Sequence, residues 1–81
     1  MRIQVSFFAS HREIVGTDTA EVDLADGATA ADLVQAVGIR YPALKPHLPS
    51  ARVAINEEYR LSNAVLREGD RAAIIPPVSG G

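Results

Sequence analysis

The sequence predicts an α+β domain in which one mixed β-sheet is covered by a single main helix. Two segments with the alternation of β-strands precede the one long amphipathic segment, and three follow it. A chain of 81 residues is long enough for one modest core and too short for two. In this order of elements we expect the first and last strands to be parallel neighbours, an arrangement called a β-grasp.

The first strand is predicted at residues 2–8, where polar and apolar residues alternate. One face carries the apolar residues Ile3, Val5 and Phe7. We expect this face to lie on the core and Phe8 to lie on the opposite face. Residues 19–24 alternate in the same way and predict the second strand. Residues 9–15 between them are ambiguous and allow a short helical turn that ends at Gly16.

The helix is predicted at residues 30–40. Thr29 lies three residues before Asp32, which is the spacing of an N-cap and its acidic partner. The apolar residues behind this pair share one helical stripe: Leu33, Val34 and Val37. Pro42 ends the helix because a proline disfavours helical geometry in the residue before it.

The second half of the chain is predicted to contain three strands. Residues 42–50 hold three prolines and are expected to form a loop. Residues 52–55 alternate as a third strand, and a turn at residues 56–58 leads into a short fourth strand at residues 59–61. Residues 71–75 form the last strand.

Composition excludes several classes of function. The formal net charge is −2 and no basic block occurs, so a nucleic-acid partner is not expected. The chain has no cysteine, which excludes disulfides, cysteine-ligated metals and a persulfide on the chain itself. His11 and His47 have no ligand spacing around them, so we expect both on the surface and no metal site. No apolar run approaches the length of a membrane span, and we expect a soluble, cytoplasmic protein with no membrane partner.

The end of the sequence has a different character, and we divide the chain into a domain at residues 1–75 and a tail at residues 76–81. Two prolines cannot continue a sheet and favour an extended stem, which reaches at most about 20 Å over six residues. Two glycines follow, and their path can be as narrow as the backbone. The carboxylate at the end is ionised near neutral pH. It can attack the α-phosphate of ATP and become an acyl adenylate. The alternative interpretation of residues 76–81 is an ordinary frayed terminus without a function.

A docking surface is predicted beside this tail. If alternate residues of the first and last strands face the helix, then Phe8 and Ile75 face away from it at the end where the tail leaves. An exposed apolar patch beside a projecting tail is typical of a binding surface, and Tyr59 is a further candidate for it. The alternative is that Phe8 packs under residues 9–16 and that Ile75 is a single exposed aliphatic residue.

Several segments together resemble a known family. They are Val5-Ser6-Phe7-Phe8-Ala9, Arg12-Glu13-Ile14-Val15-Gly16-Thr17-Asp18, Asn56, Gly69-Asp70 and Ile75-Pro76-Pro77-Val78-Ser79-Gly80-Gly81. With these residues the chain resembles the MoaD family, the small sulfur-carrying subunits of molybdopterin synthase, which are ubiquitin-like β-grasp proteins.

The resemblance implies a sulfur-transfer cycle with other proteins. An E1-like enzyme adenylates the C-terminal carboxylate with ATP, and a sulfur donor protein then supplies the sulfur of a thiocarboxylate. The large subunit of molybdopterin synthase receives the tail, in a heterotetramer of two small and two large subunits. Its side chains catalyse sulfur transfer to cyclic pyranopterin monophosphate, which builds the dithiolene of molybdopterin. The small subunit alone is non-catalytic and binds no cofactor.

The resemblance also implies roles for individual residues. Gly81 is the reactive terminus. The residues that thread into the partner's active site are Pro76, Pro77, Val78, Ser79 and Gly80. Phe8, Tyr59 and Ile75 form the partner-binding apolar patch. Three alternatives remain open: a sulfur carrier of the thiamine pathway, a protein modifier joined to lysines through its terminus, and a β-grasp binding module with an idle tail.

Overall fold

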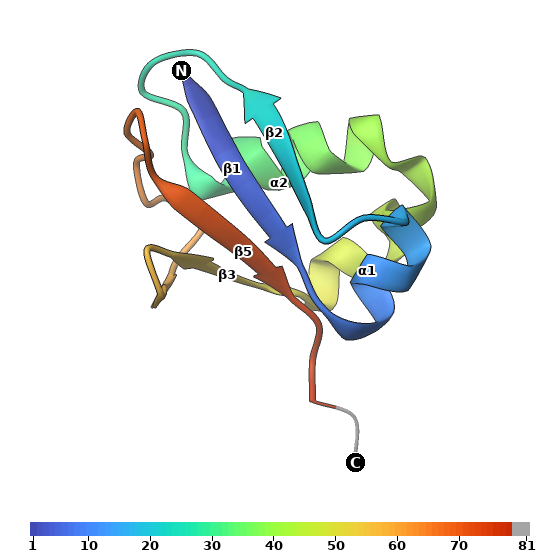
Figure 1. Cartoon of the computed structure of the whole chain (residues 1–81). Coiled ribbons are helices and arrows are strands. Elements are labelled where there is room, and N and C mark those ends of the chain that lie inside the picture. Colours follow the sequence, from blue (N-terminus) through green and yellow to red (C-terminus); the bar gives the residue numbers. More distant parts are fainter. Residues whose placement is uncertain (79–81) are drawn as a thin grey trace.

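The computed structural model describes residues 1–78 of the chain. Its elements, in chain order, are β1 (Arg2–Phe7), α1 (Ala9–Val15), β2 (Thr19–Asp23), α2 (Ala30–Arg40), the 3₁₀-helix η1 (Pro42–Ser50), β3 (Arg52–Ile55), β4 (Glu58–Arg60) and β5 (Arg71–Ile75). The five strands form one sheet in the order β2-β1-β5-β3-β4, and α2 lies across one of its faces (Figure 1).

The sheet has the mixed topology of a β-grasp. β1 and β5 pair in parallel, with Phe7 opposite Ile74, while every other strand pair is antiparallel. β5, the last strand in sequence, is therefore the central strand of the sheet. This confirms the predicted fold class and the predicted neighbourhood of the first and last strands.

The core lies between the sheet and α2. The inward face of β1 is buried as the alternation predicts, with Ile3 and Val5 fully inaccessible to solvent. Leu33 and Val37 of α2 are equally buried. Each such side chain contributes about 1.5–3 kcal/mol by leaving water, so these few residues account for much of the fold's stability.

The start of α2 is fixed by a capping box, as the sequence predicts. The Thr29 side chain accepts a hydrogen bond from the Asp32 backbone N–H at 3.3 Å. In return the Asp32 carboxylate accepts one from the Thr29 backbone N–H at 2.9 Å. These two bonds satisfy donors that every helix leaves unpaired at its first turn. The helix covers the residues predicted from the sequence and ends before Pro42.

The prediction of a loop at residues 42–50 is wrong, because this segment is the 3₁₀-helix η1. The fixed φ of proline is compatible with 3₁₀ geometry, so three separated prolines within nine residues do not prevent this kind of turn. Leu44 and Leu48 anchor the segment in the core. Gly38 of α2 allows the close approach, since a Cβ there would lie 3.1 Å from Leu48 Cδ1.

The fourth strand begins one residue earlier than predicted. The turn between β3 and β4 contains only Asn56 and Glu57, which both have positive φ, at 50° and 71°. Two such residues make a tight hairpin of the kind that matches the twist of a sheet. Glu58 consequently pairs with Ile55 as the first residue of β4.

The ambiguous segment at residues 9–15 forms the short helix α1. Gly16 ends it with a φ of 86°, and its N–H donates a hydrogen bond to the Arg12 carbonyl. Within residues 1–78, no helix has the length and apolar character needed to cross a membrane.

The capping box gives a first testable prediction. Replacing Thr29 by alanine removes the side-chain acceptor and should lower the free energy of unfolding by about 1 kcal/mol, which corresponds to roughly 4–8 °C in Tm for a domain of this size. Thr29→Ser retains a hydroxyl and should unfold close to the parent in urea and thermal melts. Equal losses for both variants would show that the cap contributes nothing specific.

Candidate partner-binding site

The tail leaves from the end of the central strand. β5 ends at Ile75, and the chain continues through Pro76 and Pro77 away from the sheet and the helices (Figure 1). Val78 is 98% exposed and so packs against no part of the described chain. The predicted threading residues Ser79 and Gly80 and the predicted reactive residue, Gly81, lie outside the described residues.

Phe8 and Ile75 lie on the sheet face opposite the helix. Their neighbours Phe7 and Ile74 pair with one another and are buried on the helix side, so alternation turns the next residue of each strand outward. Phe8 retains extended backbone geometry as the residue that precedes α1, and it is 47% exposed. Ile75 is half-buried. The arrangement expected for the apolar patch is therefore present, while its role in partner binding stays a prediction.

Tyr59 belongs to the same outer face. It is opposite Ala54, which in turn is opposite Ala73 of β5, so a row of uncharged side chains crosses from β4 to the centre of the sheet. Tyr59 is 62% exposed, and the Arg52 guanidinium lies 5.3 Å from its ring centroid. This geometry is a cation–π contact that orients the ring. We call Phe8, Tyr59 and Ile75, with the small residues between them, the outer patch.

His11 is buried, which contradicts the predicted surface position. It is 1% exposed, and its Nδ1 lies 3.4 Å from the carbonyl oxygen of Ile74 in β5. Helical spacing explains the error, because His11 shares one face of α1 with the partly buried Ile14 and Val15. That spacing is visible in the sequence once α1 is accepted as a helix. His47 is exposed, as predicted.

His11 connects α1 to the strand that carries the tail. Its ring is held within hydrogen-bonding reach of the last buried residue of β5, directly before Ile75. A neutral imidazole with its proton on Nδ1 donates to such a carbonyl. α1 therefore supports the point at which the chain leaves the sheet.

Asn56 and Asp70, which contribute to the family resemblance, have a structural role. The Asn56 side chain donates to Asp70 Oδ1 at 2.9 Å and accepts from the Arg71 backbone N–H at 3.0 Å. Asp70 Oδ2 also accepts from the Arg67 backbone N–H at 2.8 Å. These bonds tie the β3–β4 hairpin to the start of β5.

Several charged side chains form exposed ion pairs. Arg12 lies 3.6 Å from Asp18, and Arg2 donates to Asp23 at 3.2 Å. The hydrogen bond and charge of Asp23 raise the pKa of the Arg2 guanidinium, which is protonated at any physiological pH in either case. In the part of the chain from Met1 to Val78, no three metal-ligating side chains cluster.

The order of the elements and the parallel pairing of β1 with β5 define a ubiquitin-like β-grasp protein. The model of the ThiS family matches residues 5–81. The molybdopterin synthase sulfur carrier subunit of Chlamydomonas reinhardtii is 39% identical, with all of both chains covered. The chain therefore belongs to the ThiS family and, within it, groups with the sulfur carrier subunits of molybdopterin synthase that its motifs resemble.

Solved structures agree with this placement. The small archaeal modifier protein 1 of Haloferax volcanii superposes with a TM-score of 0.89 at 27% identity, over 95% of this chain and 98% of that one. A chain from the complex of subunits 1 and 2 of the molybdopterin-converting factor of Helicobacter pylori has a TM-score of 0.72 at 26% identity, with full coverage of both chains.

The support that His11 gives to β5 can be tested by substitution. His11→Ala leaves a hole beside Ile74 and removes its polar contact, so the free energy of unfolding should fall by about 2 kcal/mol or more. The matched control is His47→Ala, an exposed substitution expected to change it by less than about 0.5 kcal/mol. Urea titration of both variants measures the difference. Indistinguishable midpoints would contradict the structural role of His11.

Proposed function

We propose that this chain is the sulfur-carrier subunit of a molybdopterin synthase and that Gly81 carries the sulfur. The observation that supports this most strongly is the central position of β5. It makes the last strand a rigid part of the core and directs the following residues away from the domain beside an exposed apolar patch. The full-length similarity to molybdopterin synthase sulfur carrier subunits supports the same assignment.

The activation step uses the carboxylate of Gly81 as a nucleophile. One carboxylate oxygen attacks the α-phosphorus of ATP, the bond to the β-phosphate breaks, and pyrophosphate leaves. The resulting acyl adenylate is then attacked at its carbonyl carbon by sulfur from a donor protein or by sulfide. AMP leaves, and with sulfide the chain then ends in a thiocarboxylate. With a persulfide donor the product is an acyl disulfide, and a second thiol cleaves it, releasing the thiocarboxylate and forming a disulfide with the donor sulfur. The E1-like enzyme holds the ATP.

The delivery step needs no acid, base or metal from the folded domain. The thiocarboxylate enters the active site of the large subunit, and its sulfur bonds to a carbon of cyclic pyranopterin monophosphate. Water then cleaves the acyl–sulfur bond, so the sulfur stays on the pterin and the chain returns to a carboxylate. Because a dithiolene contains two sulfur atoms, two carriers are consumed for each product. The glycines at the end suit this step, since no side chain widens the tail where it must enter a cleft.

Partner binding is assigned to the outer patch and the tail together. Phe8 and Ile75 flank the exit of the tail, so a partner that covers them also captures the residues that follow. Exposed aromatic and aliphatic side chains of this kind are what a partner desolvates at an interface. The Helicobacter pylori complex of subunits 1 and 2 supports a large subunit as one partner. The E1-like enzyme is the second, and the assembly with the large subunit is a heterotetramer.

The second candidate function is that of a protein modifier, and the similarity to small archaeal modifier protein 1 supports this candidate. A modifier needs the same acyl adenylate but passes its carbonyl carbon to a lysine amine, so that an isopeptide bond forms. The two candidates differ in the acceptor and not in the fold. Detection of Gly81 in isopeptide linkage to cellular proteins would favour the modifier, and rescue of molybdopterin synthesis without such conjugates would favour the carrier.

The carrier assignment predicts a mass change at the terminus. After incubation with the E1-like enzyme, ATP and sulfide, intact-mass spectrometry should show replacement of one oxygen by sulfur in the parent chain. A variant extended by one alanine beyond Gly81 is the control, because it buries the Gly81 carbonyl in a peptide bond. It should show the same melting temperature and no sulfur. A parent chain that remains unmodified, or sulfur on the extended variant, would contradict the assignment.

A further inference from the structure

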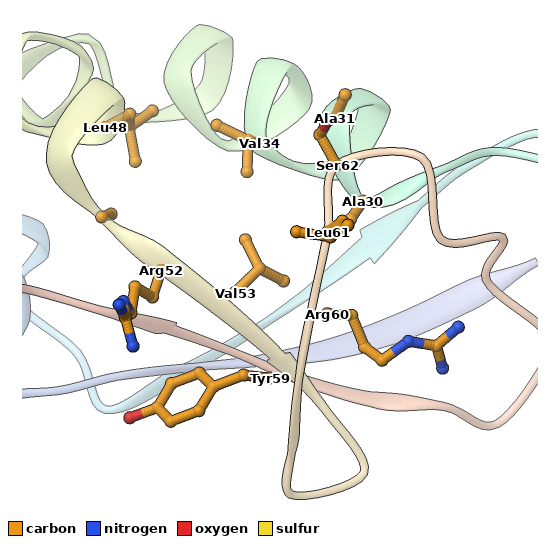
Figure 2. Close-up of a pocket in the computed structure, with 11 residues that line it drawn as sticks. Ala30, Ala31, Val34, Leu48, Arg52, Val53, Tyr59, Arg60, Leu61 and Ser62 are labelled. Carbon is orange, nitrogen blue, oxygen red and sulfur yellow. The ribbon is translucent and has the colours of Figure 1, made fainter.

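A groove lies on the helix side of the sheet and meets the outer patch at Tyr59. Its volume is about 600 Å³, and it opens between α2, the end of η1, β3 and the segment that follows β4 (Figure 2). α2 therefore faces the β3–β4 edge of the sheet across the groove. The volume lies within the range of sites that bind small molecules or peptide side chains.

The floor of the groove is aliphatic. Val34, Leu48, Val53 and Leu61 come from four different segments and point toward one open space (Figure 2). Leu61 is 79% exposed although it points into the groove, and Val34 and Val53 are only half-buried. A partner side chain that filled this space would remove apolar surface from water on all sides, at about 25 cal/mol per Å².

The rim of the groove is cationic. Arg60 lies opposite Val53 on the groove side of β4. Arg52 lies opposite Ile75 and contacts the Tyr59 ring, so it reaches the rim from the outer face. No aspartate or glutamate lines the groove. Both arginines are exposed, and across residues 1–78 neither forms an ion pair. Guanidinium groups with free N–H donors suit carboxylates, because they bind both oxygens at once. The charge at the rim therefore selects an acidic partner.

The strand beside the groove is an open edge. β4 is the outermost strand of the sheet, and all three of its residues are exposed. An edge strand presents unpaired backbone groups that a further extended segment can bind. This favours an extended occupant, which can lie along β4 and send alternate side chains toward the groove.

We propose that this groove binds an extended segment of a partner protein in which a branched aliphatic residue is flanked by acidic residues. The aliphatic side chain enters between Val34, Val53 and Leu61, and the carboxylates meet the two arginines at the rim. Arg52 and Tyr59 belong both to this rim and to the outer face, so the two surfaces are continuous around β4. A partner that covers the outer patch can extend such a segment into the groove. The proposal does not depend on chemistry at Gly81.

A synthetic peptide tests the proposal with the full chain. The probe is acetyl-Glu-Asp-Val-Ile-Asp-Glu-amide, and the control peptide replaces each acid by lysine. In a titration followed by NMR of the isotope-labelled chain, the acidic probe should shift the amides of Val53, Arg60 and Leu61 in a saturable way. The lysine peptide should bind at least about tenfold more weakly.

Charge reversal on the protein sharpens the test. Arg52→Glu combined with Arg60→Glu changes two exposed side chains, so the fold should persist. The double variant should bind the acidic probe about tenfold or more weakly than the parent chain does, and it should bind the lysine peptide instead. Leu61→Ser should weaken binding of the acidic probe to the parent chain and of the lysine peptide to the double variant, because it removes apolar surface from the floor of the groove.

Four results would overturn the proposal. One is the absence of shifts up to millimolar acidic probe, and another is equal binding of both peptides to the parent chain. The third is a set of shifts confined to Phe8 and Ile75, which would place the peptide on the outer patch. The last is self-association of the parent chain without any peptide, seen by size-exclusion chromatography and lost in the double variant. That result would assign the groove to a second copy of the chain and would equally reject a partner segment.

Discussion

The parallel pairing of β1 with β5 is the constraint on which the rest of this molecule depends. It joins the first and last strands in the sequence and puts the last one, β5, at the centre of the sheet, between β1 and β3. Phe7 and Ile74 meet in this pairing on the buried side, and the same register turns Phe8 and Ile75 to the outer side. The position of the outer patch and the exit of the tail therefore follow from one set of strand contacts. Loosening β5 without losing the core is difficult, because its inward residues are part of that core.

The polar residues of the folded domain have structural roles, and the proposed reacting group lies outside the domain. Three polar residues of kinds that also occur in catalytic sites have structural roles instead: His11, Asn56 and Asp70. Each contacts β5 or joins the β3–β4 hairpin to it. Under the proposed function this is what a carrier needs, since the reacting atom belongs to the backbone of the last residue and the catalytic groups belong to its partners.

The sequence predicts most of the fold because its local signals agree with the tertiary structure. The pattern at Thr29 and Asp32 marks the start of α2, and the alternation of the strands sets which residues are buried. The errors arise where a residue type has two structural uses. Prolines end helices but also suit 3₁₀ turns, so η1 is predicted as a loop, and Asn56 and Glu57 adopt positive φ, which places the start of β4 one residue earlier.

The candidate site is predictable only in part. Strand alternation gives the facing of Phe8 and Ile75, because side-chain direction is a local property once the strands are known. The burial of His11 needs the helical assignment of α1 as well. The groove cannot be predicted from local patterns, since its lining residues Val34, Leu48, Val53 and Leu61 come from four different segments that only the tertiary fold brings together.

The most direct test of the central claim is hydrogen exchange of the full chain, alone and bound to the large synthase subunit. We expect new protection at Phe8, Tyr59 and Ile75 and at the amides from Val78 onward, because the partner covers the outer patch and the tail together. The slow amides in the middle of β1 and β5 should exchange as in the free chain, since the domain is already formed. Unchanged exchange at the outer patch and tail, with protection limited to β2 and α1, would contradict the claim.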